Sequence, residues 1–284
     1  MEDKKPEHLY KCFGSRNPEA PEVNSMHILF SSRIAASANP AKILIEECFS
    51  ESGGMWKWKG HTLVDTEVEN ILEIPTNFES DGLVVLSTHK SKKEYPALTV
   101  HVPGNWDAAD FGGEPRTLNT VMPGRMKEIL RGQAEGNEKH GLGWNVNMEV
   151  DHHGPTCSIP IMFVEIGSSE KEWNNSVAAR INAEAVIKML ESGSDYDAYF
   201  CVGGGHYSRK FTRMNLEDPE RAAGHILPKY RAPSIGMDTF KQAMEKSVED
   251  VRGVIIEKKG VRREQRELIE EFAREYGTEL KIEK

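Results

Sequence analysis

Short apolar runs alternate with longer amphipathic stretches along most of the chain. The runs at 25–31, 81–89 and 159–167 are nearly continuous, which suits strands that are buried on both faces. At 95–104 and 144–150 apolar and polar residues alternate, as they do in strands with one covered face. The pattern therefore predicts at least five strands in the first 170 residues.

Other stretches have the spacing of helices. From 169 to 190 apolar residues recur every four positions, which predicts one long helix. Residues 117–136 predict a second helix with a Pro-Gly interruption. Residues 39–49 predict a third, with Asn39 as N-cap and Pro40 at the first helical position. The remaining predicted elements are a strand at 196–202, a helix at 238–249, a strand at 253–258, a helix at 263–276 and a strand at 278–282.

The order of these elements indicates the fold class. Alternating strands and helices are typical of an α/β protein with a mixed or largely parallel central sheet and helices on both faces. Residues 1–24 contain two prolines and no periodicity, and we interpret them as an N-terminal extension. Residues 25–284 then form the main domain, whose size suits one large domain or two closely packed α/β subdomains.

Composition narrows the classes of protein. With 38% hydrophobic and 29% charged residues, no apolar run of membrane-spanning length and a polar N-terminus, the chain is expected to be soluble, cytoplasmic and without a membrane partner. The four cysteines form no CxxC pair, which argues against a disulfide framework and a thiolate zinc cluster. The net charge of −9 argues against DNA binding, but residues 203–231 carry six basic and three acidic side chains. This segment remains compatible with binding a polyanion.

Four polar loops follow predicted strands, at 87–94, 101–106, 151–156 and 203–210. Ligands of open α/β sheets bind beyond the carboxyl ends of the strands, so these loops converge if their strands share an edge. The last loop places three glycines before His206. Its backbone N–H groups can approach a phosphate or carbonyl oxygen closely, and His206 can act as a general base. A tight turn with a surface histidine is the alternative.

His152 and His153 are adjacent, so they would face opposite sides of a strand. Only a turn at Gly154-Pro155 lets both contribute to one site, and no established ligand spacing supports a metal there. The alternative is one buried and one solvated histidine. Glu165 interrupts an apolar strand near its end, where a carboxylate orients a histidine, ligates a metal or reaches solvent.

His89 ends a buried strand just before Lys90, Lys92 and Lys93, which suits either a contact with an anionic ligand or a solvated loop. His101 points away from the apolar face of its strand, five residues before Trp106. Trp106 is either a platform on which a nucleobase stacks or the buried anchor of its loop.

Four sequence blocks together resemble a known family. They are "STHKSKKEYPALTVHVPGNW", "DHHGPT", "FVEIGSSEKEW" and "GGGHYSRKFT", and in this order they resemble the archaeal and plant type of D-aminoacyl-tRNA deacylase. The likeness runs from about Met26 to the C-terminus. It implies hydrolysis of the ester between a D-amino acid and the 3′ end of tRNA, which keeps D-residues out of translation. It also implies a fold similar to peptidyl-tRNA hydrolase and the phosphorylase/hydrolase-like proteins, and a dependence on zinc.

Ester hydrolysis needs a positioned water, a base or metal that activates it, and donors for the oxyanion. The predicted catalytic residues are His152, His153, Glu165 and His206, and the predicted metal ligands are His152, His153 and His206. The predicted contacts of the tRNA acceptor end are Gly203, Gly204, Gly205, Tyr207, Arg209, Lys210, His89, Lys90, Lys92, Lys93, His101 and Trp106.

Two other functions are compatible with the same residues. One is a metal-dependent phosphorylase or nucleosidase-like hydrolase on a similar fold. The other is a non-catalytic tRNA-binding protein, which would bind tRNA in a salt-dependent way without deacylating it. A monomer is the expected oligomeric state.

Overall fold

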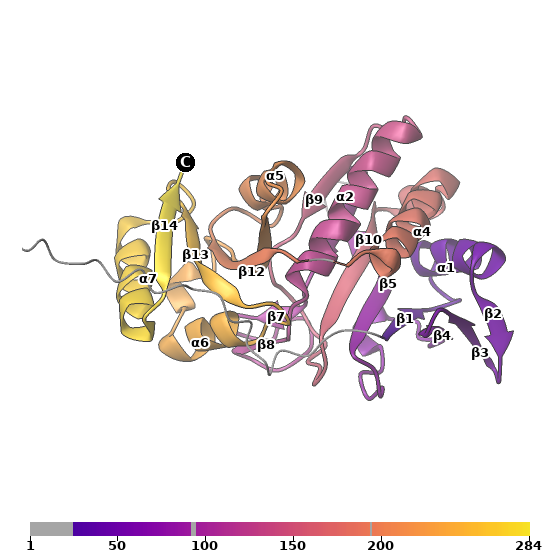
Figure 1. Ribbon diagram of the computed structural model, residues 1–284, viewed down its shortest axis with the longest axis horizontal. Coiled ribbons are helices and arrows are strands. Elements are labelled where there is room, and N and C mark those ends of the chain that lie inside the picture. Colours follow the sequence, from indigo (N-terminus) through magenta and orange to yellow (C-terminus); the bar gives the residue numbers. More distant parts are fainter. Residues whose placement is uncertain (1–24, 92–94, 194) are drawn as a thin grey trace, which may run out of the picture.

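The computed structural model describes residues 25–91, 95–193 and 195–284, so the predicted extension 1–24 and the pair Lys92 and Lys93 lie outside the described residues. An eight-stranded sheet forms one part of the fold, in the order β2-β3-β4-β1-β5-β10-β6-β9 (Figure 1). Its strands are β1 (Met26–Phe30), β2 (Ser50–Ser52), β3 (Met55–Trp58), β4 (His61–Asp65), β5 (Gly82–Lys90), β6 (Ala97–His101), β9 (Asn145–Met148) and β10 (Ile161–Ser168).

Both strand directions occur in this large sheet. β4, β1, β5 and β10 are parallel to one another, β2 and β3 are antiparallel neighbours at one edge, and β6 is antiparallel to β10. β9 is parallel to β6. The pair β6 and β9 therefore runs against the four central strands, which decides where the polar loops leave the sheet.

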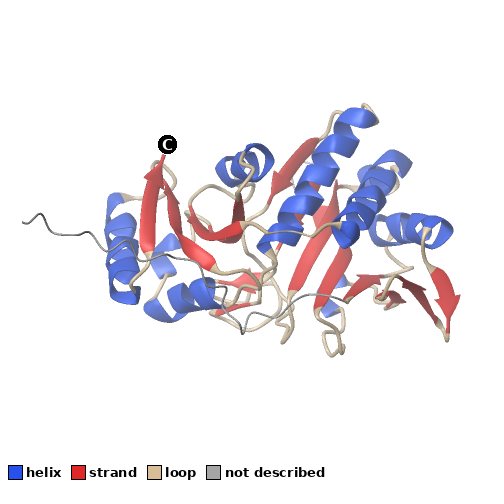
Figure 2. Ribbon diagram, in the orientation of Figure 1, coloured by secondary structure: helices blue, strands red, loops and turns tan. Residues whose placement is uncertain are grey.

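Three helices cover one face of the large sheet: α1 (Ala35–Glu47), α2 (Pro123–Lys139) and α4 (Ser176–Glu191) (Figure 2). Their apolar side chains share a core with Val84, Met162 and Val164 of the sheet. On the opposite face, Leu83 and Phe163 pack against the segment that contains the 3-10 turn η1 (Ile71–Glu73). Beyond this segment, toward β6 and β9, the same face carries buried polar side chains.

A second sheet has four parallel strands, in the order β12-β11-β13-β14. They are β11 (Asp197–Val202), β12 (Arg221–Leu227), β13 (Val251–Glu257) and β14 (Glu279–Glu283). One face packs on α6 (Met237–Glu245) and α7 (Arg263–Tyr276), and the other packs on α5 (Arg209–Glu217), whose Phe211 belongs to the core of the large sheet. Short elements complete the fold: β7 (Gly104–Asn105), β8 (Thr117–Leu118), α3 (Glu170–Trp173) and η2 (Ala232–Ser234).

A short stretch of chain joins the two sheets. After β11 the chain crosses to β9, where Val150 donates its backbone N–H to the oxygen of His206 and Ser208 donates to Met148. These bonds flank an isolated antiparallel bridge between Glu149 and Tyr207. The predicted glycine loop is therefore fixed beside the large sheet (Figure 1).

The predicted α/β class is confirmed, while several element boundaries were wrong. The helix predicted at 117–136 begins only at Pro123, because proline fits the first turn and lacks the N–H that a helix interior needs. The helix predicted from 169 to 190 is divided, because Asn175 caps a new helix through the N–H groups of Val177 and Ala178. α1 begins at Ala35, so Asn39 is not its N-cap and Pro40 lies inside it. Within the described residues, no helix is long and apolar enough to span a bilayer.

Candidate active site

A row of buried polar side chains lies on the face of the large sheet opposite the three helices. Along β10, Val164 faces the helices, so the next residue, Glu165, points to the opposite face. Thr99 of β6 is paired with Glu165, and His101 is paired with Phe163 two positions away. His89 of β5 is paired with Gly167 on the other side of β10. Paired residues point the same way, so these polar side chains share one face.

Three of the four polar loops, at 101–106, 151–156 and 203–210, meet at the cavity described below, but the loop after His89 leaves the sheet elsewhere. Because β6 runs against β5, the loop after His89 leaves the sheet at the end opposite to the loop after His101. His89 reaches the site through the face of the sheet, where it is 4% exposed. Lys90, the next residue in β5, is exposed and points to the other face, away from the site. His89 and Lys90 thus face opposite sides of the sheet, and their contact with tRNA stays a prediction.

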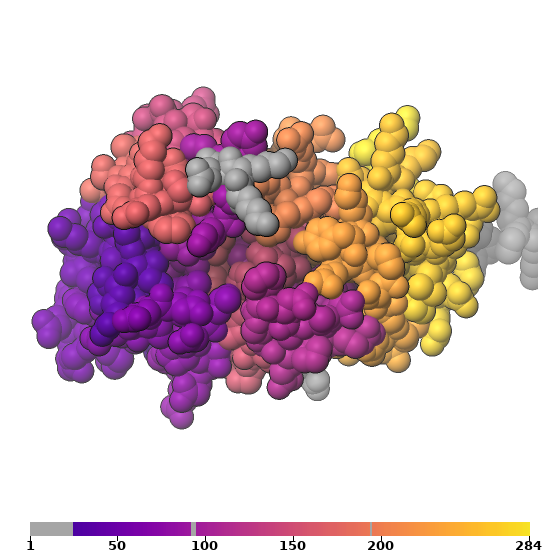
Figure 3. Space-filling model, turned by 180° about the vertical axis from the view of Figure 1, so that it is seen from behind, coloured from indigo at the N-terminus to yellow at the C-terminus, as the bar shows by residue number. Residues whose placement is uncertain are grey.

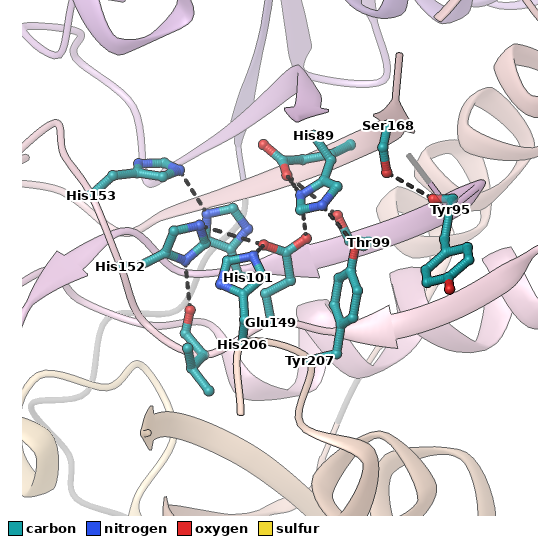
Figure 4. Close-up of polar contacts among 12 residues, drawn as sticks. His89, Tyr95, Thr99, His101, Glu149, His152, His153, Ser168, His206 and Tyr207 are labelled. Atoms are coloured by element: carbon teal, nitrogen blue, oxygen red, sulfur yellow. Dashed lines mark hydrogen bonds and ion pairs between the residues drawn. The ribbon is translucent and has the colours of Figure 1, made fainter. Parts of the chain in front are cut away.

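Glu149 is at the centre of the site, directly after β9 (Figure 4). Its side chain is fully buried, and one oxygen, Oε1, lies 2.9 Å from Nδ1 of His89. The other, Oε2, lies 2.9 Å from Nε2 of His206 and 3.4 Å from Nε2 of His152. One carboxylate thus contacts histidines from β5 and from the glycine loop, and it lies near a third from the 151–154 turn.

The charges of this cluster follow from its contacts. Burial alone would raise the pKa of Glu149, but hydrogen bonds from His206 and His89 hold it well below its ordinary value. Burial alone would lower the pKa of His89, but Glu149 and Glu165 together raise it to about 10. His89 is therefore an imidazolium at neutral pH. Its Nε2 donates to the Tyr207 hydroxyl at 2.7 Å, which fixes that ring beside the site.

Glu165 lies beneath this cluster. Its Oε2 accepts from the Thr99 hydroxyl at 3.3 Å and lies 3.6 Å from Nδ1 of His89. The carboxylate is 3% exposed and contributes no lining to the cavity described below. Glu165 is thus placed to orient His89, one of the roles that the sequence left open.

The 151–154 turn brings His152 and His153 to one side, as predicted. His153 adopts a left-handed conformation with φ 47°, and the two rings meet at 4.4 Å between centroids. His152 donates from Nδ1 to the oxygen of Val150 at 2.7 Å, and His153 donates from Nδ1 to the oxygen of Gly154. Both Nε2 atoms therefore present lone pairs.

His101 completes a group of three. Its Nε2 lies 3.1 Å from Nε2 of His153, and its ring stacks on His152 at 4.4 Å. Burial and the neighbouring histidines hold the pKa of His101 well below its ordinary value, and burial lowers that of His152 to about 3. Neutral imidazoles whose Nδ1 atoms are held by backbone oxygens are the usual ligands of zinc in proteins.

Candidate ligand groups follow from these distances. Within the described ranges three groups have ligand atoms within 4.8 Å of one another, and they consist of His101, His152 and His153, of His89, Glu149 and His206, and of His101, Glu149 and Glu165. In the first group the pKa values of His101 and His152 are lowered, whereas in the second the pKa of His89 is raised to about 10. The predicted set of His152, His153 and His206 is not among these groups: His101 joins His152 and His153, and His206 groups with His89 and Glu149.

A cavity of about 250 Å³ opens above the histidines. The side chain of His206 lines this cavity and is 40% exposed. The cavity is lined by Gly104, Asn105, Trp106, Ala108, Asp110, Phe111, Asp151, His152, His153, His206, Tyr230 and Arg231.

The three glycines serve different purposes. Gly203 has φ +131°, and a Cβ there would lie 2.7 Å from Cβ of Glu257. Its N–H already donates to the oxygen of Leu227, so it is not an oxyanion donor. Gly204 has φ +83° and accepts from the N–H of Lys229. Gly205 has open space around its Cβ position, which leaves it as the glycine that a ligand can approach.

We expect alanine at Gly203 to disturb folding, and alanine at Gly205 to disturb only the approach of a ligand. Gly203→Ala should lower the free energy of unfolding by roughly 2 kcal/mol or more, because the backbone is strained and Glu257 must move. Gly205→Ala should change it by less than about 0.5 kcal/mol. Chemical denaturation measures both values. Equal destabilisation by the two variants would contradict this division.

Several predicted tRNA contacts have other roles in the structure. Trp106 is 2% exposed and stacks on Phe200 at 5.6 Å between centroids, so it anchors its loop and has no open face for a base. Lys210 donates to Glu283 at 3.0 Å and to the backbone oxygen of Lys284. Arg209 is exposed at the start of α5.

Sequence reasoning missed the central carboxylate. Glu149 stands in the polar phase of an alternating strand, where a charged residue usually meets solvent. Its only sequence signal was its place three residues before His152. A buried pair was missed as well: Nδ1 of His225 lies 2.6 Å from Oδ2 of Asp151, whose Oδ1 accepts the N–H of Ile226. This pair fastens the 151–154 turn to β12.

Fold and site together define a class of protein. An α/β protein with a cavity lined by histidines, two of which contact a buried carboxylate, has the groups that a hydrolytic enzyme uses. A family model described as D-aminoacyl-tRNA deacylase matches residues 76–281, and the chain belongs to this family.

Relatives agree with this assignment, and one solved structure shares the fold. The chain is 40% identical over 222 residues to the D-aminoacyl-tRNA deacylase of Pyrococcus horikoshii, covering 76% of this chain and 78% of that protein. It is 35% identical over 259 residues to that of Thermoplasma acidophilum, covering 90% and 99%. A crystal structure described as a conserved protein of unknown function superposes with a TM-score of 0.81 at 26% identity, covering 91% of this chain and 94% of the other.

Proposed function

We propose that this protein hydrolyses the ester of D-aminoacyl-tRNA and that the cavity above Glu149 receives the aminoacylated 3′ end. The observation that carries the proposal is the position of Glu149, which contacts His89, His206 and His152 at once. A buried carboxylate that orients an accessible histidine is the arrangement by which many hydrolases activate a nucleophile. Family membership supplies the substrate class.

His206 is the general base in this proposal. Its Nε2 donates to Glu149 at 2.9 Å, which leaves the Nδ1 lone pair to accept a proton from water. The water oxygen then forms a bond to the ester carbon, and collapse of the tetrahedral intermediate breaks the bond to the ribose oxygen. That oxygen takes the proton back from His206. The products are the free D-amino acid and the tRNA.

Glu149 and His89 prepare this step without touching the substrate. The carboxylate stays ionised because His89 carries a positive charge beside it. It therefore stabilises the imidazolium that His206 becomes, as the acid of a catalytic triad does. Glu165 also keeps His89 in place, because its Oε2 lies 3.6 Å from Nδ1 of His89.

Zinc fits the group of His101, His152 and His153. The donor atoms are imidazole nitrogens, and backbone oxygens fix the tautomer of His152 and His153. A zinc ion held there would supply Lewis-acid polarisation of the ester carbonyl or of a water.

The tRNA acceptor end would lie along the second sheet. Arg209 is exposed four residues beyond Gly205, and we propose that it meets a phosphate of the 3′ strand. The Gly205 N–H is the donor that we propose for the ester oxygen. Such a substrate also fits the predicted cytoplasmic location.

Chirality of the ester is the test of this function. We expect D-tyrosyl-tRNA to be deacylated and L-tyrosyl-tRNA to be left intact, and we expect His206→Ala to lower the rate by roughly 10²- to 10⁴-fold. Release of radiolabelled tyrosine at one enzyme concentration measures both. Turnover of both enantiomers alike, or of neither, would contradict the proposal.

The two alternative functions predict different results. A nucleosidase or phosphorylase would act on nucleosides with phosphate and need no tRNA. A tRNA-binding protein would bind the acceptor end with strong salt dependence while the ester stayed intact. Family membership favours neither.

A further inference from the structure

Two aromatic side chains remain exposed at the rim of the cavity. Phe111 is 69% exposed and Tyr230 is 50% exposed, and both line the cavity above the histidines. The described residues leave six large hydrophobic side chains exposed, so a third of them belong to this one cavity. Among the described residues, neither ring takes part in a ring pair. Exposed aromatic rings beside a polar cavity are typical of a ligand-binding surface.

The rings are held by rigid loops from the two halves of the fold. Phe111 accepts the N–H of Gly154 at its backbone oxygen, which ties its loop to the 151–154 turn. The Asn105 amide donates to the oxygen of Gly112, the next residue. Tyr230 follows Lys229, whose N–H donates to the oxygen of Gly204. Each ring is therefore positioned by a loop that also positions a histidine of the site.

An ion-pair latch connects the two loops beside the rings. Nη2 of Arg231 lies 3.1 Å from Oδ2 of Asp110, and its Nη1 lies 3.6 Å from Oδ2 of Asp107. The Ser234 hydroxyl donates to Asp107 at 2.9 Å. Arg231 adjoins Tyr230 and Asp110 adjoins Phe111, so the latch fixes both rings along the same opening. Figure 4 shows the histidines that lie beside this opening, and Figure 3 shows the molecular surface from behind.

The size of the cavity decides what the rings meet. At about 250 Å³ it is below the roughly 300–1,000 Å³ of pockets that enclose a drug-sized ligand. An aminoacyl group fits such a space, whereas an aminoacyl group together with a nucleoside does not. When the ester lies at His206, the base of the same nucleoside has to remain at the rim.

The geometry points to a base-binding platform: Phe111 and Tyr230 stack on the terminal base of the tRNA while the aminoacyl group occupies the cavity. This inference rests on the proposed function, because it takes the aminoacyl ester as the ligand. The chemistry recognised is a flat aromatic ring, which every base offers and which an aromatic amino acid also has.

Binding of a non-hydrolysable ligand tests the platform without needing turnover. The probe is 3′-(D-tyrosylamino)-3′-deoxyadenosine, an amide in place of the ester, and its partner is the same amide on a ribose without a base. We expect the wild-type protein to bind the adenosine probe roughly tenfold more tightly than the base-free one in calorimetry. Phe111→Ala and Tyr230→Ala should each remove most of this preference and leave the affinity for the base-free probe unchanged.

Matched variants separate stacking from structural damage. Phe111→Tyr and Tyr230→Phe keep the rings and should keep the preference. Tyr276→Ala removes an exposed ring of α7, which does not line the cavity, and should also keep it. A preference that survives Phe111→Ala and Tyr230→Ala together would overturn the inference.

The source of the recognised ring is decided by a second pair of probes. With D-alanyl in place of D-tyrosyl, a base platform predicts the same loss in the variants. Loss with the D-tyrosyl probes alone would assign the rings to the amino acid side chain and overturn the base assignment. If the wild-type protein hydrolyses no D-aminoacyl ester but shows the ring-dependent preference, the proposed function fails and the platform stands.

Discussion

Replacing Glu149 with glutamine should lower the rate of deacylation at saturating D-tyrosyl-tRNA by roughly 10²- to 10⁴-fold. Glutamine keeps the shape of the side chain but removes the charge that orients His206 and stabilises its protonated form. It also leaves the imidazolium of His89 with Glu165 alone, at 3.6 Å. Single-turnover measurements report the chemical step directly.

The matched control is Glu165→Gln. Both carboxylates are buried and both contact His89, but only Glu149 reaches His206 and His152. We therefore expect Glu165→Gln to lower the rate much less, on the order of tenfold. Similar losses in the two variants would show that the charge on His89, rather than the contact with His206, is what the reaction needs.

Stability against pH gives the Glu149 variant a second readout. The pKa of His89 is about 10 in the folded protein, compared with about 6.5 in an unfolded chain. Its contribution is fully present below about pH 6.5 and is lost as the pH rises toward 10. In Glu149→Gln the folded pKa falls, so the decline in melting temperature between pH 7 and 10 should become smaller. An identical alkaline decline in both proteins would contradict the pairing.

Local patterns predicted the elements but not the way in which they form a site. The apolar run at 81–89 and the alternation at 95–104 identified β5 and β6, because burial on two faces or one leaves a clear periodicity. Whether two strands run parallel or antiparallel is a long-range property and leaves no such trace. Because β6 runs against β5 and β10, the site lies on the face of the sheet opposite the helices and not at a shared edge.

The same limit explains which site residues were found. Histidines and glycines are conspicuous in sequence, so the sequence alone predicts His152, His153 and His206 as site residues. Glu149 and His225 look like ordinary strand residues, and only burial and pairing reveal their roles. Gly203 is conspicuous in sequence but has no ligand to meet: the group that lies too close for a side chain at Gly203 is Glu257 of the same chain.

The choice of His101 over His206 as the third ligand leads to a prediction about metal content. In protein purified without a histidine tag, alanine at His101, His152 or His153 should weaken zinc binding by roughly 100-fold or more, because each removes one of three donor nitrogens. His206→Ala should keep the zinc and lose the activity, since its Nε2 is engaged by Glu149. Elemental analysis after dialysis against a chelator measures the first effect, and deacylation after zinc is returned measures the second.

These two readouts assign binding and catalysis to different histidines. Loss of zinc from His206→Ala together with its retention in His101→Ala would restore the ligand set that the sequence alone predicted. Full activity of the metal-free wild-type protein would leave His206 and Glu149 as the whole catalytic apparatus. In that case the short contact between His101 and His153 would be a hydrogen bond between neutral rings, in which His101 donates from Nε2 and His153 accepts.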